Sequence, residues 1–124
     1  MPADRKILIV EDNPLLAEAL ERAGAQLEIE TECASDGWEA IEKLEHAHYS
    51  TIVIDTDLPR HSGFGVLTYL REEVGDHLEN VILMTSSDQD ALERHVSGER
   101  VRVIRKTMAV DELARAIAVD CSSE

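Results

Sequence analysis

Polar side chains that could transfer a phosphoryl group follow the apolar segments of this sequence. Glu11 and Asp12 follow the first apolar run, and Asp55 ends the second. Thr85 and Lys106 follow two later runs. An aspartate carboxylate can attack phosphorus, a hydroxyl can donate a hydrogen bond to a phosphoryl oxygen, and an ammonium can neutralise one. Together these residue types indicate the formation of an aspartyl phosphate.

The acids among these residues also indicate a metal ion. If Glu11, Asp12 and Asp55 lie close together, they repel one another and raise one another's pKa. A hard divalent cation removes this penalty, and oxygen ligands with few carboxylates suit Mg²⁺. We therefore expect Mg²⁺, or Mn²⁺ in its place, at these acids.

The elements that must position these residues alternate between strands and helices. Three continuous apolar runs predict buried strands at 6–10, 51–55 and 81–84, and a last strand is predicted at 101–105. The alternation of 27–33 predicts an edge strand. Helices are predicted at 14–23 with Gly24 as the stop and at 35–44 with Ser35 as the cap. A further helix, capped by Ser62, is predicted to carry Val66, Leu67 and Leu70, and two more are predicted at 87–96 and 110–119. Five strand–helix units favour an α/β fold, a doubly wound parallel sheet with helices on both faces. In such a sheet, ligands bind at the carboxyl ends of the strands.

Length and charge restrict the class of protein. The 124 residues suit one domain, so we expect residues 1–124 to form a single unit with no effector domain in the chain. With 26 acids against 12 bases the net charge is −14, which disfavours binding to nucleic acid or an anionic membrane. The apolar run 7–10 is too short for a signal or a span, which favours a cytoplasmic location. Cys33 and Cys121 are expected to be reduced and unpaired.

From Lys6 to Val119 the sequence resembles the receiver domain of two-component response regulators. The resemblance rests on motifs in the family's order: Val10-Glu11-Asp12-Asn13, Asp36-Gly-Trp-Glu-Ala-Ile41, Asp55 with Pro59 and Gly63 downstream, Thr85, Lys106 and Asp111-Glu112-Leu113. It implies a flavodoxin-like sheet with the strand order 2-1-3-4-5.

The resemblance also implies a role for each site residue. Asp55 would accept a phosphoryl group from a sensor histidine kinase or a phosphotransfer protein, and Thr85 and Lys106 would hold the phosphoryl oxygens. Asp12 would bind Mg²⁺ directly, Glu11 mainly through water, and Asp57 through its backbone carbonyl, with Asp55 as a further ligand. The family is a signalling phosphoacceptor that catalyses its own dephosphorylation rather than an enzyme with an external substrate.

Several positions depart from the family's pattern. Thr107 replaces the usual proline after the lysine, so we expect a trans Lys106–Thr107 bond and a remodelled loop. Val103 replaces the usual switch aromatic and has no large rotamer swing to couple to output. Ser86 is a mild change, and Asp57 and Ser87 stand where the family tunes dephosphorylation.

Two other functions are compatible with parts of this pattern. One is a phosphorylation-independent pseudo-receiver that acts as a protein-interaction module, which the departures at Val103 and Thr107 favour. The other is a haloacid-dehalogenase-like phosphohydrolase, suggested by Asp55-Thr-Asp57, although that fold needs a longer chain.

A locally basic segment and one tryptophan remain outside the predicted site. The basic segment contains Arg94, Arg100, Arg102 and Arg105 and is either a solvated charge run or a surface for a homodimer or an output partner. Trp38, at a predicted helix start, is expected to pack partly against the domain.

Overall fold

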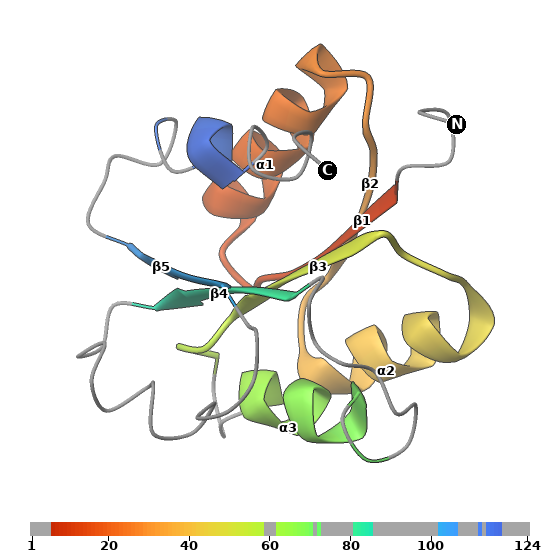
Figure 1. Ribbon diagram of the computed structural model, residues 1–124. Helices are drawn as coiled ribbons and strands as arrows, with labels where there is room; N and C mark the ends of the chain where they lie inside the picture. Colours follow the sequence, from red (N-terminus) through yellow and green to blue (C-terminus); the bar gives the residue numbers. More distant parts are fainter. Residues whose placement is uncertain are drawn as a thin grey trace.

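A five-stranded parallel sheet forms the centre of the molecule. The computed structural model describes residues 6–58, 62–70, 72, 81–85, 102–106, 112 and 114–117. The strands are β1 (Lys6–Val10), β2 (Glu30–Ala34), β3 (Thr51–Asp55), β4 (Val81–Thr85) and β5 (Arg102–Arg105). Their order is β2-β1-β3-β4-β5, with every neighbouring pair parallel (Figure 1). The predicted doubly wound order, with the alternating strand at one edge, is confirmed.

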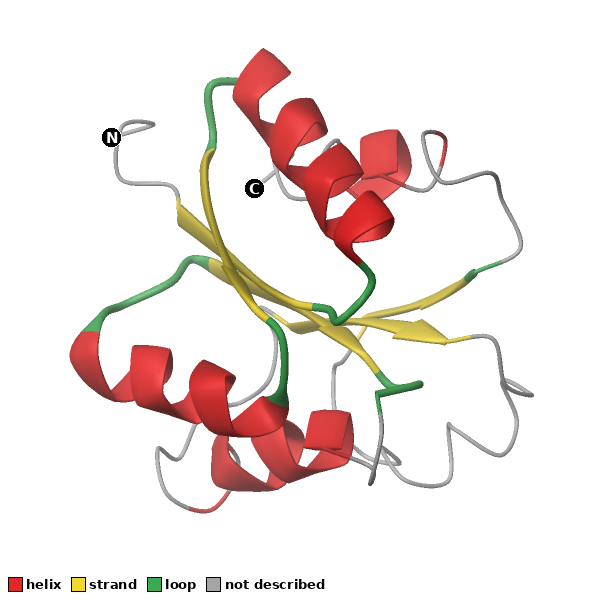
Figure 2. Ribbon diagram, turned by 180° about the vertical axis from the view of Figure 1, so that it is seen from behind, coloured by secondary structure: helices red, strands yellow, loops and turns green. Residues whose placement is uncertain are grey.

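Helices cover both faces of this sheet. The helix α1 (Pro14–Gln26) and the helical residues 114–117 lie on one face, and α2 (Gly37–His46) and α3 (Ser62–Tyr69) lie on the other (Figures 1 and 2). Leu8 and Val10 of β1 belong to the core beneath α2 and α3, whereas Ile7 and Ile9 belong to the opposite core. Since successive side chains of a strand point to opposite faces, burial on both faces explains the continuous apolar runs.

The first helix continues past its predicted end. Asn13 caps α1 by accepting a hydrogen bond from the Leu15 N–H at 3.0 Å, and the helix runs to Gln26, so the predicted stop at Gly24 is wrong. Gly24 is buried inside the helix, and a Cβ built there would lie 2.9 Å from Thr31 Cγ2. The glycine therefore permits close contact with β2 rather than terminating the helix.

The edge strand begins later than predicted. β2 starts at Glu30 rather than at residue 27. Leu27 is the C-cap of α1 and is 41% exposed, and Glu28 has a φ of 60°. Because this left-handed conformation interrupts an extended backbone, the alternating sequence at 27–29 does not form part of the strand.

The cap of α2 also differs from the prediction. Asp36 rather than Ser35 is the N-cap, and its Oδ1 accepts a hydrogen bond from the Glu39 N–H at 2.8 Å. Glu39 Oε1 in turn accepts from the Ser35 N–H at 2.7 Å and from its hydroxyl at 3.0 Å. These bonds give acceptors to the N–H of Glu39 in the first turn and to the N–H of Ser35 just before the helix. Trp38 is 85% exposed, so the expected packing of this side chain is wrong.

The remaining predicted elements are confirmed where the structure describes them. β3 and β4 are buried along their whole length, and Val66, Leu67, Leu70, Ala114 and Ile117 are buried under the covering helices. Cys33 is in no disulfide among the described residues. The predicted helix 87–96 and Cys121 lie outside the described residues.

Candidate functional site

The predicted site residues lie at one edge of the sheet, where the parallel strands end. Glu11 follows β1, Asp55 and Thr85 are the last residues of β3 and β4, and Lys106 follows β5. Backbone hydrogen bonds continue beyond the strands: Glu11 N–H donates to Ala34 O at 2.9 Å, and Lys106 N–H donates to Thr85 O at 2.7 Å. The main chain thus fixes the position of each residue.

Three carboxylates meet at this edge. One oxygen each from Glu11, Asp12 and Asp55 can be chosen so that all lie within 4.8 Å of one another. Glu11 and Asp55 are only 3% and 2% exposed, whereas Asp12 is exposed. Like charges at this separation are unfavourable in a buried site, so the arrangement needs either a proton or a cation.

The Glu11 carboxylate is buried, and only one of its two oxygens has a hydrogen-bond partner among the described residues. Its Oε2 accepts a hydrogen bond from the Asn13 N–H at 3.0 Å, and its buried Oε1 has no hydrogen-bond partner among the described residues. Burial, followed by the neighbouring Asp55 carboxylate, raises the pKa of Glu11 from 4.5 to about 8, despite the opposing Asn13 N–H and the Lys106 charge. An unpartnered buried oxygen beside two further carboxylates fits a hard cation such as Mg²⁺.

Lys106 follows β5 and extends past β4 to the acids. Its Nζ lies 2.9 Å from Asp55 Oδ2 and 3.5 Å from Asp57 Oδ2. Burial lowers the pKa of Lys106, but the hydrogen bond to Asp55 and the charges of Asp55, Glu11 and Asp57 outweigh it, so the pKa lies above its ordinary value. The lysine is therefore a fixed positive charge at neutral pH.

Both oxygens of Asp55 are held in place. Oδ2 accepts from Lys106, and Oδ1 accepts from the Asp57 N–H at 2.8 Å. Asp57 therefore contacts the site in two ways, through its N–H and through its side chain, and the contact of its carboxylate with Lys106 was not predicted from the sequence.

Thr85 occupies a buried position between neighbouring strand ends. It is fully buried, and the β4–β5 register places it opposite Arg105. In the β3–β4 register Asp55 faces Met84, so Thr85 stands one residue further along its strand. Its backbone lies at the end of β4, the strand next to β3.

Two residues that support the site were missed by the sequence reasoning. Asn13 both caps α1 and donates its N–H to Glu11. Thr56, also buried, donates its N–H and its hydroxyl to Met84 O at 2.9 and 3.1 Å, which joins the end of β3 to β4. An Asn-Pro pair at a predicted helix start could have indicated the first; the second has no sequence signal of comparable strength.

Some predicted departures lie outside the described residues. Val103 is half-buried and packs against the core beneath α2 and α3. Thr107 with its expected trans bond, Ser86 and Ser87 are not among the described residues. The basic segment is described only as part of the β5 backbone, at Arg102 and Arg105, and both Arg94 and Arg100 lie outside the described ranges.

Comparison with known proteins decides the family. The model of the response regulator receiver domain matches residues 7–118. This chain belongs to that family. It is 33% identical over 111 residues to the transcriptional regulatory protein PmrA of Pectobacterium parmentieri, a match that covers 87% of this chain and 48% of that protein. The chain thus spans about half the length of this relative.

Solved receiver structures show the same fold. The phosphorylated cyanobacterial phytochrome response regulator RcpA has a TM-score of 0.78 at 21% identity, covering 96% of this chain and 94% of that one. The response regulator TrrA of Thermotoga maritima, solved in complex with Mg²⁺ and BeF, has a TM-score of 0.72 at 24% identity, covering 91% and 96%. Within the described part of this receiver domain, no helix combines the length and apolar character needed to cross a bilayer.

Proposed function

We propose that this receiver domain accepts a phosphoryl group on Asp55 in a Mg²⁺-dependent reaction. The donor would be a phosphohistidine of a sensor histidine kinase or a phosphotransfer protein, and the proposal places donor and acceptor in the cytoplasm. The observation that carries this proposal is the environment of Asp55, which is 2% exposed, bonded to Lys106 at 2.9 Å and clustered with Glu11 and Asp12.

The contacts of Asp55 suit a nucleophile. The Asp57 N–H holds one carboxylate oxygen and Lys106 holds the other, so the group is oriented before a donor arrives. In the proposed reaction an Asp55 oxygen forms a bond to phosphorus, and the electron pair of the breaking P–N bond returns to the donor imidazole. Lys106 would then neutralise a phosphoryl oxygen, and the Thr85 hydroxyl would donate a hydrogen bond to another.

The acids suit the metal that the reaction is proposed to need. Glu11, Asp12, Asp55 and the Asp57 backbone carbonyl would hold Mg²⁺, with Mn²⁺ as a substitute. A bound cation would supply neutralisation of the phosphoryl oxygens. The buried Glu11 Oε1 supports this assignment because it finds no partner among the described residues. The TrrA structure, which contains Mg²⁺ and BeF, gives further support.

Phosphorylation is proposed to change protein–protein contacts, and the domain is proposed to remove the phosphoryl group itself by water attack. Under this proposal residues 1–124 act as one signalling unit rather than as an enzyme with an external substrate. The activity of any longer protein of the kind represented by PmrA is a separate proposal, because the match covers 48% of that relative.

A second candidate is a receiver that works without a phosphorylation-driven switch. Val103 favours this alternative, because a half-buried valine packed against the core has one dominant rotamer and cannot swing as an aromatic side chain does. Under this candidate Asp55 could be modified without any change in partner binding.

The proposal is tested with acetyl phosphate and Mg²⁺, with intact-protein mass as the readout. Wild type should gain the mass of one phosphoryl group, EDTA should prevent the gain, and Asp55→Asn should show none. Asp57→Asn is the matched control, because it neutralises a neighbouring acid and keeps both the nucleophile and the Asp57 backbone groups. If wild type and Asp55→Asn are indistinguishable in the presence of Mg²⁺, the active-receiver proposal is wrong.

A further inference from the structure

Trp38 is the most exposed large apolar side chain among the described residues. It is 85% exposed, compared with 70% for Leu15 and 41% for Leu27. It lies in the first turn of α2, and Ile41, Glu42 and Glu45 follow it at helical spacing. Burying an indole removes a large apolar surface from water, so a partner that covers Trp38 would gain binding free energy there.

The surroundings of Trp38 indicate the charge of that partner. Six residues line one hollow, and we call them the Trp38 face: Asp36, Trp38, Glu39, Ile41, Glu42 and Glu45. Four of these six are acids, and none is a lysine or an arginine. Lys43 of the same helix is paired instead with Glu32 of β2, at 3.6 Å. The face therefore combines an aromatic surface with four acids, and its described lining contains no basic side chain.

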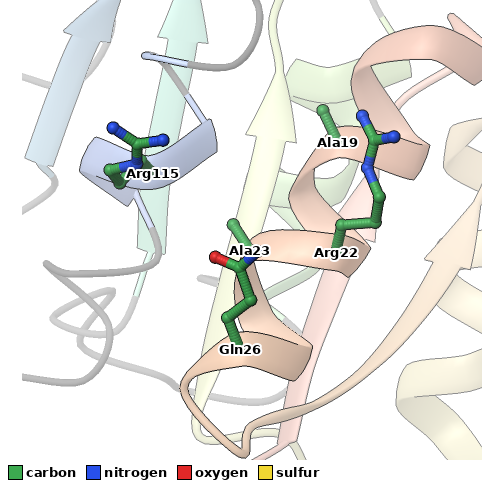
Figure 3. Close-up of a pocket in the computed structure, with 5 residues that line it drawn as sticks. All are labelled: Ala19, Arg22, Ala23, Gln26 and Arg115. Atoms are coloured by element: carbon green, nitrogen blue, oxygen red, sulfur yellow. The ribbon is translucent and has the colours of Figure 1, made fainter.

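A second copy of this chain is a poorer occupant than a basic protein segment. The opposite face of the sheet has a hollow lined by Arg22 and Arg115, together with Ala19, Ala23 and Gln26 (Figure 3). Arg22 is already near Glu18, at 3.9 Å, and each copy carries a net charge of −14. Repulsion between two such copies opposes the pairing of one copy's acidic face with the other's arginines.

We propose that the Trp38 face binds an arginine-rich segment of a protein partner. A guanidinium can stack on the indole and donate paired hydrogen bonds to a carboxylate, which matches the two kinds of group on this face. Nucleic acid is disfavoured because its phosphates carry the same sign of charge as the acids. The binding is a function separate from the phosphoacceptor reaction, since none of the six residues belongs to the Asp55 cluster.

The sequence contains a single tryptophan, so its fluorescence reports on this face directly. The probe is a synthetic helical peptide with one arginine per turn, and its reference is the same peptide with glutamine at every arginine. We expect the arginine peptide to shift the Trp38 emission to the blue and to bind at least about tenfold more tightly than the glutamine peptide. Added salt should weaken the binding.

Variants separate a specific face from attraction to an acidic protein. Glu42→Lys with Glu45→Lys should weaken peptide binding about tenfold. The matched control, Glu18→Lys with Glu21→Lys, makes the same charge change at exposed positions of α1 and should weaken it less than about twofold. Trp38→Ala, measured by calorimetry, should also weaken binding, and every variant should keep its Mg²⁺-dependent mass gain.

Four results would overturn the proposal. If the α1 control variant weakens peptide binding as much as Glu42→Lys with Glu45→Lys does, only net charge attracts the peptide. Unchanged affinity in Trp38→Ala, or no emission shift at saturation, would remove the indole from the interface. Concentration-dependent dimerisation that Trp38→Ala abolishes would identify a second copy as the occupant. Because the mass gain on Asp55 is measured separately, failure here is distinguishable from failure of the phosphoacceptor proposal.

Discussion

Replacing Glu11 by glutamine is expected to stabilise the metal-free protein at neutral pH. The side chain is 3% exposed, and burial, together with the neighbouring Asp55 carboxylate, raises its pKa to about 8. In the unfolded chain the ordinary pKa is 4.5. Between these two values the folded protein binds a proton that the unfolded chain does not bind. The free energy of unfolding therefore falls as the pH rises from 4.5 to 8.

The size of this effect follows from the pKa difference. One pH unit corresponds to about 1.36 kcal/mol, so at pH 7 the wild-type protein has lost about 3 kcal/mol relative to its stability below pH 4.5. Glutamine has nearly the same shape and no charge at any pH. We therefore expect Glu11→Gln to be about 3 kcal/mol more stable than wild type at pH 7 and about 1 kcal/mol more stable at pH 5.

Denaturant unfolding in EDTA between pH 5 and pH 9 measures this difference. Glu18→Gln is the matched control, since Glu18 is exposed on α1 and its substitution should change stability by less than about 0.5 kcal/mol. Adding Mg²⁺ should stabilise wild type, by mass action on the folded state, and should stabilise Glu11→Gln less. A Glu11→Gln protein with the same stability and pH slope as wild type in EDTA would refute the reasoning.

Three further substitutions test the fold by denaturant unfolding. Gly24→Ala should lower the free energy of unfolding by about 1–3 kcal/mol because the new Cβ meets Thr31 at 2.9 Å, whereas Gly65→Ala, with nothing within 4 Å, should not destabilise. Asp36→Ala removes the cap of α2 and should cost about 0.5–2 kcal/mol; no loss would mean that Ser35 replaces it. Leu8→Ala, at a fully buried position in β1, should cost about 2–5 kcal/mol, and a cost below 1 kcal/mol would contradict its place in the core.

The gathering of the site residues at the carboxyl ends of the strands could be predicted because two simple rules combine there. Continuous apolar runs identify strands buried on both faces, and parallel strands bring their carboxyl ends together. Asp55 and Lys106 are 51 residues apart in the chain, yet the topology alone places both at the same edge of the sheet. No knowledge of side-chain conformations is needed for that step.

The details of the helices could not be predicted because they depend on three-dimensional contacts. Glycine is a residue type that often ends helices, but at position 24 it allows Thr31 of β2 to approach the helix closely. Ser35 and Asp36 are both good N-cap residues, and only the position of the Glu39 N–H decides between them. The left-handed conformation of Glu28 likewise breaks an alternation that the sequence alone favours as strand.

The loss of folding stability caused by the buried Glu11 is itself an argument for a chemical role at the carboxyl ends of the strands. A glutamine at the same position would keep the size of the side chain and avoid the charge, so stability alone does not explain a glutamate there. The surface acids of α2 differ in this respect, because Glu42 and Glu45 remain in contact with water. A fold that retains a buried acid with one oxygen unpartnered among the described residues gives up stability at that point. Such a loss is expected where a site must hold a cation, and it separates Glu11 from the many acids that only give the chain its negative charge.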